Sequence, residues 1–132
     1  MPPTLLLLAP DGDPEKWSVT LLNDLGAALA QVTRKTDVVA RYSEAKFVCL
    51  LVDCNSSGGI IAADRLRASM QEFTARTGVT LSAGIATYAE WMESGDVLMQ
   101  EARKALEVAQ ISGGDRTELP RADATDGAPT EE

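Results

Sequence analysis

The stretch Arg41-Tyr42-Ser43-Glu44-Ala45-Lys46-Phe47 separates two short runs of strand-forming residues and decides how the chain folds. The first run is Asp37–Tyr42 and the second is Phe47–Asp53, and valine and other apolar residues dominate both. The few residues between the two runs leave room only for a tight turn. We therefore predict a β-hairpin in the first half of the chain.

The residues before the hairpin predict a buried strand followed by a helix. Thr4–Ala9 is a short, unbroken apolar run, which is typical of a central strand buried on both faces. Asp13 is expected to cap the following helix, with Pro14 in its first turn. Apolar residues then recur at helical spacing and form one stripe, made up of Trp17, Leu21, Leu22, Leu25, Ala28, Leu29 and Val32.

The residues after the hairpin predict two more helices and two more strands. A loop over 55–59 leads into a helix that ends at Gly78, and Val79–Ala86 is the next strand. The buried face of that helix is expected to hold Ala62, Leu66, Met70 and Phe73. A further helix over 96–111 directs Leu98, Ala102, Ala105, Leu106 and Ala109 inward. Gly113-Gly114 ends this helix, and Arg116–Leu119 is expected to form a short edge strand.

The order of these elements is β-α-β-β-α-β-α-β, which predicts the fold class. It begins as a ferredoxin-like split unit and adds a helix and an edge strand. We expect an α/β (α+β) fold in which helices cover a central, mostly antiparallel sheet. Residues 1–119 form the single domain, and 120–132 carry four acidic residues, one arginine and no large apolar residue. We interpret that segment as an acidic, disordered tail.

Composition excludes several classes of function. The 132 residues carry a net charge of −8 with a pI of about 4.5, so long nucleic acids and anionic membranes would be repelled. The chain has no histidine and only two cysteines, which argues against a zinc site, and Cys49 is expected to be a buried, reduced thiol. No apolar run is long enough for a membrane span or a signal peptide. We expect a cytoplasmic protein without a cofactor.

Four segments, in order, resemble the GGDEF family, in which diguanylate cyclases condense two GTP molecules into cyclic di-GMP. The hairpin stretch stands where the family has Arg-Tyr-Gly-Gly-Asp-Glu-Phe. Val79–Ala86 resembles the family strand Val-Thr-x-Ser-x-Gly-Val-Ala, and Leu98–Ala105 resembles the helix Leu-Leu-x-x-Ala-Asp-x-Ala. Ala109–Asp115 stands where the family has Ala-Lys-x-x-Gly-Arg-Asn. The resemblance covers roughly residues 4–119 and implies the palm fold of the nucleotide cyclases.

The hairpin signature departs from the family at every residue that the family uses for chemistry. Ser43 and Glu44 replace the glycines that let the backbone approach the nucleotide closely. Ala45 and Lys46 replace the acids that bind magnesium, and an ammonium group repels a divalent cation. Phe47 matches the last residue of the signature, while Ala9 stands where the family's other metal-binding aspartate is expected.

Further departures affect the groups that hold the substrate. Gln110 and Gly114 stand where the family has a basic pair expected to grip the triphosphate. About seven residues are also missing between the first strand and the first helix, where the resemblance places a Phe-Lys-x-Ile-Asn-Asp substrate motif. Phosphoryl transfer depends on metal ions and positioned cations. We therefore predict that the chain is not an enzyme and has no catalytic or metal-binding residues.

One ligand site of the family has matching residues. Arg34-Lys35-Thr36-Asp37 is an Arg-x-x-Asp motif at the position of the family's inhibitory product site, and Arg65 occupies that of its supporting arginine. An arginine can donate two hydrogen bonds to the O6 and N7 edge of guanine. A carboxylate can accept hydrogen bonds from the guanine N1–H and amino group. We therefore predict that cyclic di-GMP binds at Arg34, Asp37 and Arg65.

A second hypothesis needs no nucleotide. An arginine near the C-terminal end of a helix commonly stabilises the helix dipole, and an aspartate at the start of a strand is commonly a turn residue. The chain would then be an interaction module that docks a protein partner or neighbouring signalling domain, or forms a homodimer. The two hypotheses differ at Arg34 and Arg65. Arginines that are free and converge on one face favour the receptor, whereas arginines held in salt bridges, for example with Asp64, favour the module.

Overall fold

The computed structural model describes residues 3–12, 17–32, 38–43, 46–52, 55–69 and 71–120. It contains five strands and four helices within these ranges. In chain order they are β1 (Thr4–Pro10), α1 (Val19–Val32), β2 (Val38–Ser43), β3 (Lys46–Leu51), α2 (Ser56–Ser69), α3 (Gln71–Thr77), β4 (Leu81–Thr87), α4 (Gly95–Ile111) and β5 (Thr117–Glu118). Arg34 and Asp37 lie outside the described residues, as do Glu44, Ala45 and the tail beyond Pro120.

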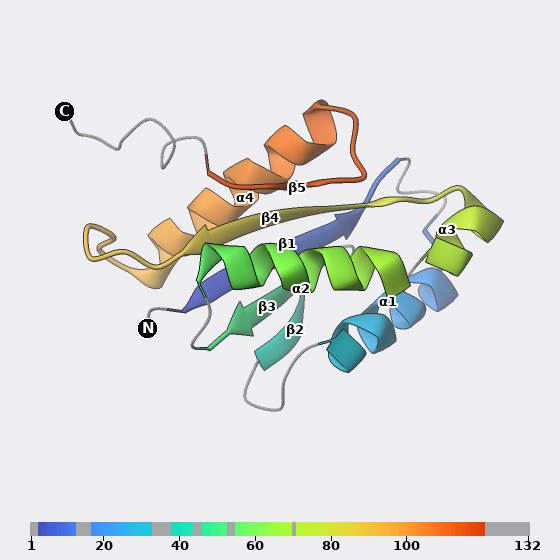
Figure 1. The fold of residues 1–132 in the computed structure, drawn as a ribbon, viewed down its shortest axis with the longest axis horizontal. Coiled ribbons are helices and arrows are strands. Elements are labelled where there is room, and N and C mark those ends of the chain that lie inside the picture. The colour runs from blue at the N-terminus through green and yellow to red at the C-terminus, as the bar shows by residue number, and fades with distance from the viewer. Residues whose placement is uncertain are drawn as a thin grey trace.

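The sheet confirms the predicted fold class. Its strand order is β2-β3-β1-β4-β5, so β1 is the central strand (Figure 1). β1 pairs antiparallel with both β3 and β4, and β2 pairs antiparallel with β3. The two-residue β5 is the only parallel strand among those described, and it extends the edge beside β4 as the sequence indicated. All seven residues of β1 are buried, as expected for a strand covered on both faces.

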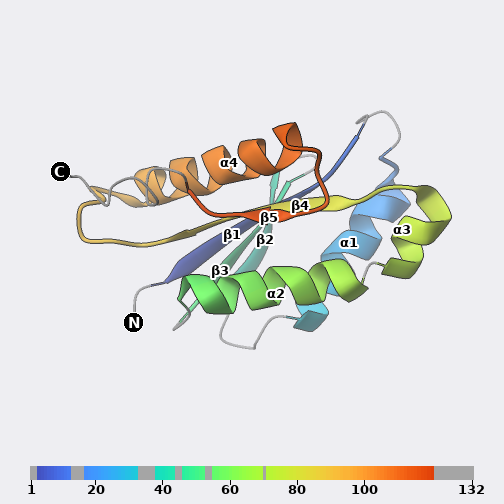
Figure 2. The ribbon, with the colours of Figure 1, turned by 45° about the horizontal axis from the view of Figure 1, so that its top comes forward.

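Helices lie on both faces of the sheet, with α4 on one side and α1, α2 and α3 on the other (Figure 2). Alternate residues of β1 supply the two cores, because successive side chains of a strand point to opposite faces. Leu6 and Leu8 pack with α1 and α2, in a core that includes Leu25 and Leu66. The second core lies under α4 and is built from Leu5, Leu7, Ala9, Ala86, Met92, Leu98, Ala102 and Leu106.

The first helix begins later than the sequence indicated. α1 starts at Val19, and Ser18 caps it, because its hydroxyl oxygen accepts a hydrogen bond from the Leu21 N–H at 3.1 Å. Trp17 therefore precedes the helix instead of opening its apolar stripe, although it still packs against the core. Asp13, the expected cap, lies outside the described residues.

The single helix predicted between β3 and β4 is two helices. α2 ends at Ser69, whose hydroxyl donates a hydrogen bond to the Leu66 carbonyl at 2.8 Å. A serine that bonds its own backbone in this way competes with helix continuation, and α3 starts at Gln71. Gly78, with φ of 76°, follows α3 as the predicted stop. α2 also begins inside the predicted loop, because the Asn55 side-chain oxygen accepts a hydrogen bond from the Gly58 N–H at 2.9 Å.

Two further predictions about buried residues are confirmed, and the predicted start of the tail differs by one residue. Cys49 is buried, as predicted, and the inward residues predicted for the last helix are all buried. Pro120, which the sequence placed in the tail, is buried. None of the described helices is long and apolar enough to cross a membrane.

Candidate functional site

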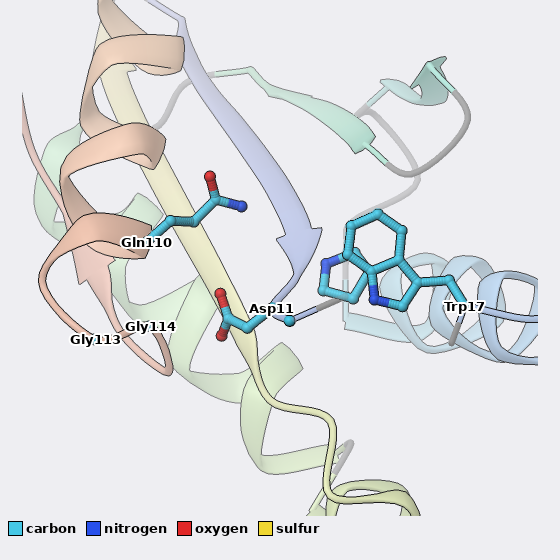
Figure 3. A pocket seen from close by; sticks show the side chains of 7 residues that line it. Asp11, Trp17, Gln110, Gly113 and Gly114 are labelled. Atoms are coloured by element: carbon cyan, nitrogen blue, oxygen red, sulfur yellow. The ribbon is translucent and has the colours of Figure 1, made fainter. Parts of the chain in front are cut away.

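An open pocket of about 390 Å³ lies at the carboxyl end of β1. It is bounded by the β1 end, by Trp17 before α1, and by the turn after α4. Its lining residues are Pro10, Asp11, Gly12, Trp17, Gln110, Gly113 and Gly114. Figure 3 shows Gln110 reaching from α4 toward β1, with Trp17 on the far side of Asp11. The pocket therefore brings together two positions that the sequence singled out, Gln110 and Gly114.

Asp11 is the most strongly bonded side chain of the pocket. Its carboxylate accepts hydrogen bonds from the hydroxyl groups of Thr80 and Ser82, both at 2.7 Å. It also accepts one from the backbone N–H of Asp115 at 2.9 Å. Both carboxylate oxygens are thus engaged with the start of β4 and with the turn after α4. The Asp11 carboxylate joins three segments that are far apart in the sequence.

The turn after α4 follows a tight path around this carboxylate. Gly113, Gly114 and Asp115 all have positive φ, at 118°, 75° and 54°. A Cβ atom on Gly114 would lie 2.7 Å from the Asp11 carboxylate carbon. Only glycine therefore fits position 114, for steric as well as conformational reasons.

The backbone donors of this turn are already used within the protein. The N–H groups of Gly113 and Gly114 donate to the carbonyls of Gln110 and Ala109, at 3.3 and 2.9 Å. The Asp115 N–H donates to Asp11. Turns that cradle phosphate present several free N–H groups to the ligand. This turn has no such row of free donors, and the pocket lining named above contains no lysine or arginine.

Arg67 holds the same turn from the other side of the sheet. Its guanidinium donates to the Asp115 carbonyl at 2.9 Å and forms an ion pair with Asp64 at 2.7 Å. The turn is therefore bonded to the β1 end through Asp11 and to α2 through Arg67. Asp64, which the sequence suggested as a partner for Arg65, pairs with Arg67 in the structure.

Truncation of Asp11 tests this arrangement. Asp11→Ala is expected to lower the free energy of unfolding by about 2–4 kcal/mol, because hydrogen bonds to a charged group contribute about 1.5–3 kcal/mol each and the buried Ser82 hydroxyl would lose its partner. Urea denaturation followed by circular dichroism measures the change. Arg67→Ala is the matched control and should cost less than about 1 kcal/mol, because its ion pairs are partly exposed. Equal losses in the two variants would contradict the central role of Asp11.

The hairpin signature is described only in part. Ser43 and Lys46 are paired across the hairpin, and the register is irregular between Arg41 and Ser43. Phe47 is buried in the core under α1 and α2, and the Arg41 guanidinium lies 5.9 Å from the centre of its ring. Ala9 is 1% exposed and packs under α4. Within the described ranges, no group of three or more acidic, cysteine or histidine residues could hold a metal ion.

The structure describes one of the three residues predicted to bind cyclic di-GMP. Arg65 is exposed on α2, and no hydrogen bond or ion pair holds it within the part of the chain that is described. Arg34 and Asp37 fall between the end of α1 and the start of β2, outside the described residues. Convergence of the three side chains is therefore not tested.

Asp11 and Ser18 were missed by the sequence analysis. An acidic residue directly after a buried strand is the signal that could have pointed to Asp11, because side chains at strand ends often line a ligand pocket. Trp17, which was predicted as part of the apolar stripe of the first helix, both packs against the core and lines the pocket.

Comparisons with known proteins agree with this architecture. A protein-family model described as the diguanylate cyclase GGDEF domain matches residues 19–116. The protein "Diguanylate cyclase A" of Treponema denticola is 27% identical over 106 residues, which make up 76% of this chain but only 29% of that protein.

Solved structures show the same fold. The active GGEEF domain of a diguanylate cyclase from Vibrio cholerae has a TM-score of 0.81 at 17% identity, covering 92% of this chain and 84% of its own. The coiled coil and GGDEF domain of DgcB from Caulobacter crescentus, solved with c-di-GMP, gives 0.74 at 19%, covering 89% and 69%. Diguanylate cyclase SiaD from Pseudomonas aeruginosa, solved with its activator SiaC, gives 0.76 at 21%, covering 89% and 50%.

Proposed function

Because the chain belongs to the GGDEF family of diguanylate cyclase domains, we propose that it is a catalytically inactive member that binds cyclic di-GMP through Arg34, Asp37 and Arg65. The ligand would act as a signal, changing the contacts of this domain with a protein partner or a neighbouring domain. The pocket at the end of β1 carries the first part of the proposal. The exposed position of Arg65 supports the second.

The chemistry of the pocket argues against binding a nucleoside triphosphate with magnesium. A triphosphate needs cations or free N–H donors. The pocket lining instead contains the neutral side-chain amide of Gln110 and a turn whose N–H groups already donate hydrogen bonds within the protein. Magnesium needs oxygen ligands in octahedral geometry. Ala9 offers a buried methyl group, and Asp11 accepts three hydrogen bonds from the protein. The described residues therefore do not fit the ion.

The first expected result is the absence of turnover. Incubation of the chain with GTP and magnesium or manganese should give no cyclic di-GMP above a blank, because the described pocket lining offers neither the cations nor the free N–H donors that stabilise the charge of phosphoryl transfer. Chromatography of the products measures this. Product that increases in proportion to protein concentration would refute the inactivity.

The exposed side chain of Arg65 favours the hypothesis of a cyclic di-GMP receptor over a purely structural role for this part of α2. It lies two residues from Arg67, which is bonded to Asp64 and Asp115, yet Arg65 itself extends from the helix without such a partner among the described residues. A solvated guanidinium is able to pair with a phosphodiester or a guanine edge. Calorimetric titration with cyclic di-GMP tests the proposal directly, with GTP and cyclic di-AMP as the comparison ligands.

An interaction module that needs no nucleotide is the second candidate function. It is favoured by the partly buried side chains of Val48 and Leu50, which lie on the face of β3 that carries α4. No heat on titration with cyclic di-GMP at high micromolar concentration would make this candidate the better one.

A further inference from the structure

Ile61 is a large apolar side chain on the solvent side of α2. It is 54% exposed, whereas Ile60 and Leu66 of the same helix pack in the core under α1 and α2. No other large apolar side chain is exposed among the residues of α2 that the structure describes. A single exposed apolar residue is common and does not by itself indicate a site. What distinguishes Ile61 is its position relative to Arg65 and to the start of β2.

Ile61 and Arg65 are neighbours on the exposed face of α2. They are four residues apart, and side chains at this spacing lie one above the other on a helix, with Cβ atoms about 5–6 Å apart. Both side chains are exposed, and no hydrogen bond or ion pair holds Arg65 within the described ranges. A ligand that pairs with the Arg65 guanidinium therefore lies within one helical turn of Ile61.

The topology shows on which side of Arg65 the rest of the proposed site lies. α2 extends toward the turn after α4, at the carboxyl end of β1, because a guanidinium near the end of α2 donates a hydrogen bond to the backbone of that turn. β2 begins at the other end of the sheet, since Val38 pairs with Leu50, one residue before β3 ends. Figure 1 shows α2 extending between these two ends. Asp37 directly precedes Val38 in the chain. A ligand that joins Arg65 to Asp37 therefore extends toward the first half of α2, which carries Ile61.

The chemistry of cyclic di-GMP suits this pair of side chains. Its phosphodiester groups pair with guanidinium groups, whereas the flat faces of its guanine rings gain from being covered and removed from water. An isoleucine one turn from an arginine offers both kinds of contact side by side. Building on the function proposed above, we propose that Ile61 packs against a base of the cyclic di-GMP molecule that Arg65 holds.

The other exposed side chains around Arg65 offer no comparable contact. Ala68 has only a methyl group, and Ser69 already uses its hydroxyl within the helix. Asp64 is an acid held in an ion pair, and its charge would repel an anionic ligand. Ile61 is therefore the position on this face of α2 where a substitution should change the affinity through an apolar contact.

Calorimetric titration of the full chain with cyclic di-GMP tests this contact. Ile61→Ala should raise the Kd about three- to tenfold, because the ligand would cover less apolar surface. Ile61→Glu should raise the Kd about tenfold or more, because a carboxylate would face the anionic ligand. Ile61→Met keeps a large apolar side chain and should retain most of the affinity.

Ile111 provides the matched control. It is 83% exposed on α4, on the other side of the sheet (Figure 2), so Ile111→Ala and Ile111→Glu should leave the Kd within about twofold. Both isoleucines are exposed, so none of these substitutions should shift the urea midpoint appreciably. Raised salt should weaken binding to the same degree in the wild-type chain and in Ile61→Ala, because salt screens charges and not apolar contacts. In Arg65→Ala the salt dependence should be smaller.

The outcomes distinguish this contact from the function on which it rests. Loss of affinity in Ile61→Ala, with Ile111→Ala unchanged, supports the contact. If Arg34→Ala weakens binding and Ile61→Ala does not, the contact is overturned and the receptor function stands. Equal effects of Ile61→Glu and Ile111→Glu would also overturn the contact, because they would show that overall charge governs the affinity. A wild-type chain that does not bind cyclic di-GMP would overturn both.

Discussion

Replacement of Arg34 by alanine is expected to weaken the binding of cyclic di-GMP by a factor of tens or more. Loss of one partner from a desolvated, charged hydrogen bond commonly costs about 2–5 kcal/mol, and the guanidinium is assigned to the O6 and N7 edge of guanine. Asp37→Ala should cost a similar amount, because the carboxylate is assigned to the N1–H and amino donors. Arg65→Ala should cost less, because in the proposed site Arg65 supports the ligand and Arg34 contacts the base edge. Calorimetric titration of each variant measures these differences.

The selectivity for cyclic di-GMP over cyclic di-AMP separates recognition of the guanine base from general charge attraction more sharply than the affinity does. Asp37→Ala should relax the preference for cyclic di-GMP over cyclic di-AMP, because adenine lacks the donors that a carboxylate would accept. Arg67→Ala is the matched control on α2, since it removes the same charge two residues from Arg65 but from a side chain already bonded to Asp64. An Arg67→Ala effect as large as that of Arg34→Ala would show that general charge, and not a specific site, governs binding.

The fold was predictable from the sequence because its strongest signals are local. The unbroken apolar run Thr4–Ala9 marked a strand buried on both faces, and β1 is the central strand. The helical spacing from Leu98 to Ala109 marked the buried face of α4. The spacing of apolar residues reflects directly which side chains are buried, so tertiary contacts did not alter the predicted secondary structure of these two segments.

The element boundaries were less predictable because single side-chain hydrogen bonds decide them. Ser18 caps α1, and Ser69 bonds back to Leu66 where α2 ends. Asp13 was predicted as the cap, and nothing in the apolar pattern pointed to Ser18 in its place. Serine and aspartate compete for the backbone in either setting, and the choice depends on packing that the sequence does not display.

The candidate site was predictable as a set of substitutions but not as a set of contacts. Gln110 and Gly114 were recognised as departures from a basic pair, and both line the pocket. Asp11 was missed because its role depends on Thr80, Ser82 and Asp115, which only the folded chain brings together.

The position of α4 itself can be tested at Gly84. An alanine Cβ at this position would collide with the Ala102 carbonyl and the Leu106 N–H, and would lie 2.9 Å from the Leu106 Cα. The obstacles are helix backbone, which cannot rotate away, so α4 would have to move off β4. Gly84→Ala is expected to lower the free energy of unfolding by about 3 kcal/mol or more, at the upper end for overpacked cores. Urea denaturation followed by circular dichroism measures the loss.

Two other glycines calibrate this prediction. A Cβ on Gly95, the first residue of α4, would meet no atom within 4 Å, so Gly95→Ala should be neutral or stabilise the fold by up to about 1 kcal/mol. A Cβ on Gly59 of α2 would lie 3.0 Å from methyl groups of Ile85 and Thr4. Side chains give way more easily than backbone, so Gly59→Ala should fall between the other two. A Gly84→Ala protein as stable as Gly95→Ala would mean that α4 does not pack on β4 at this distance.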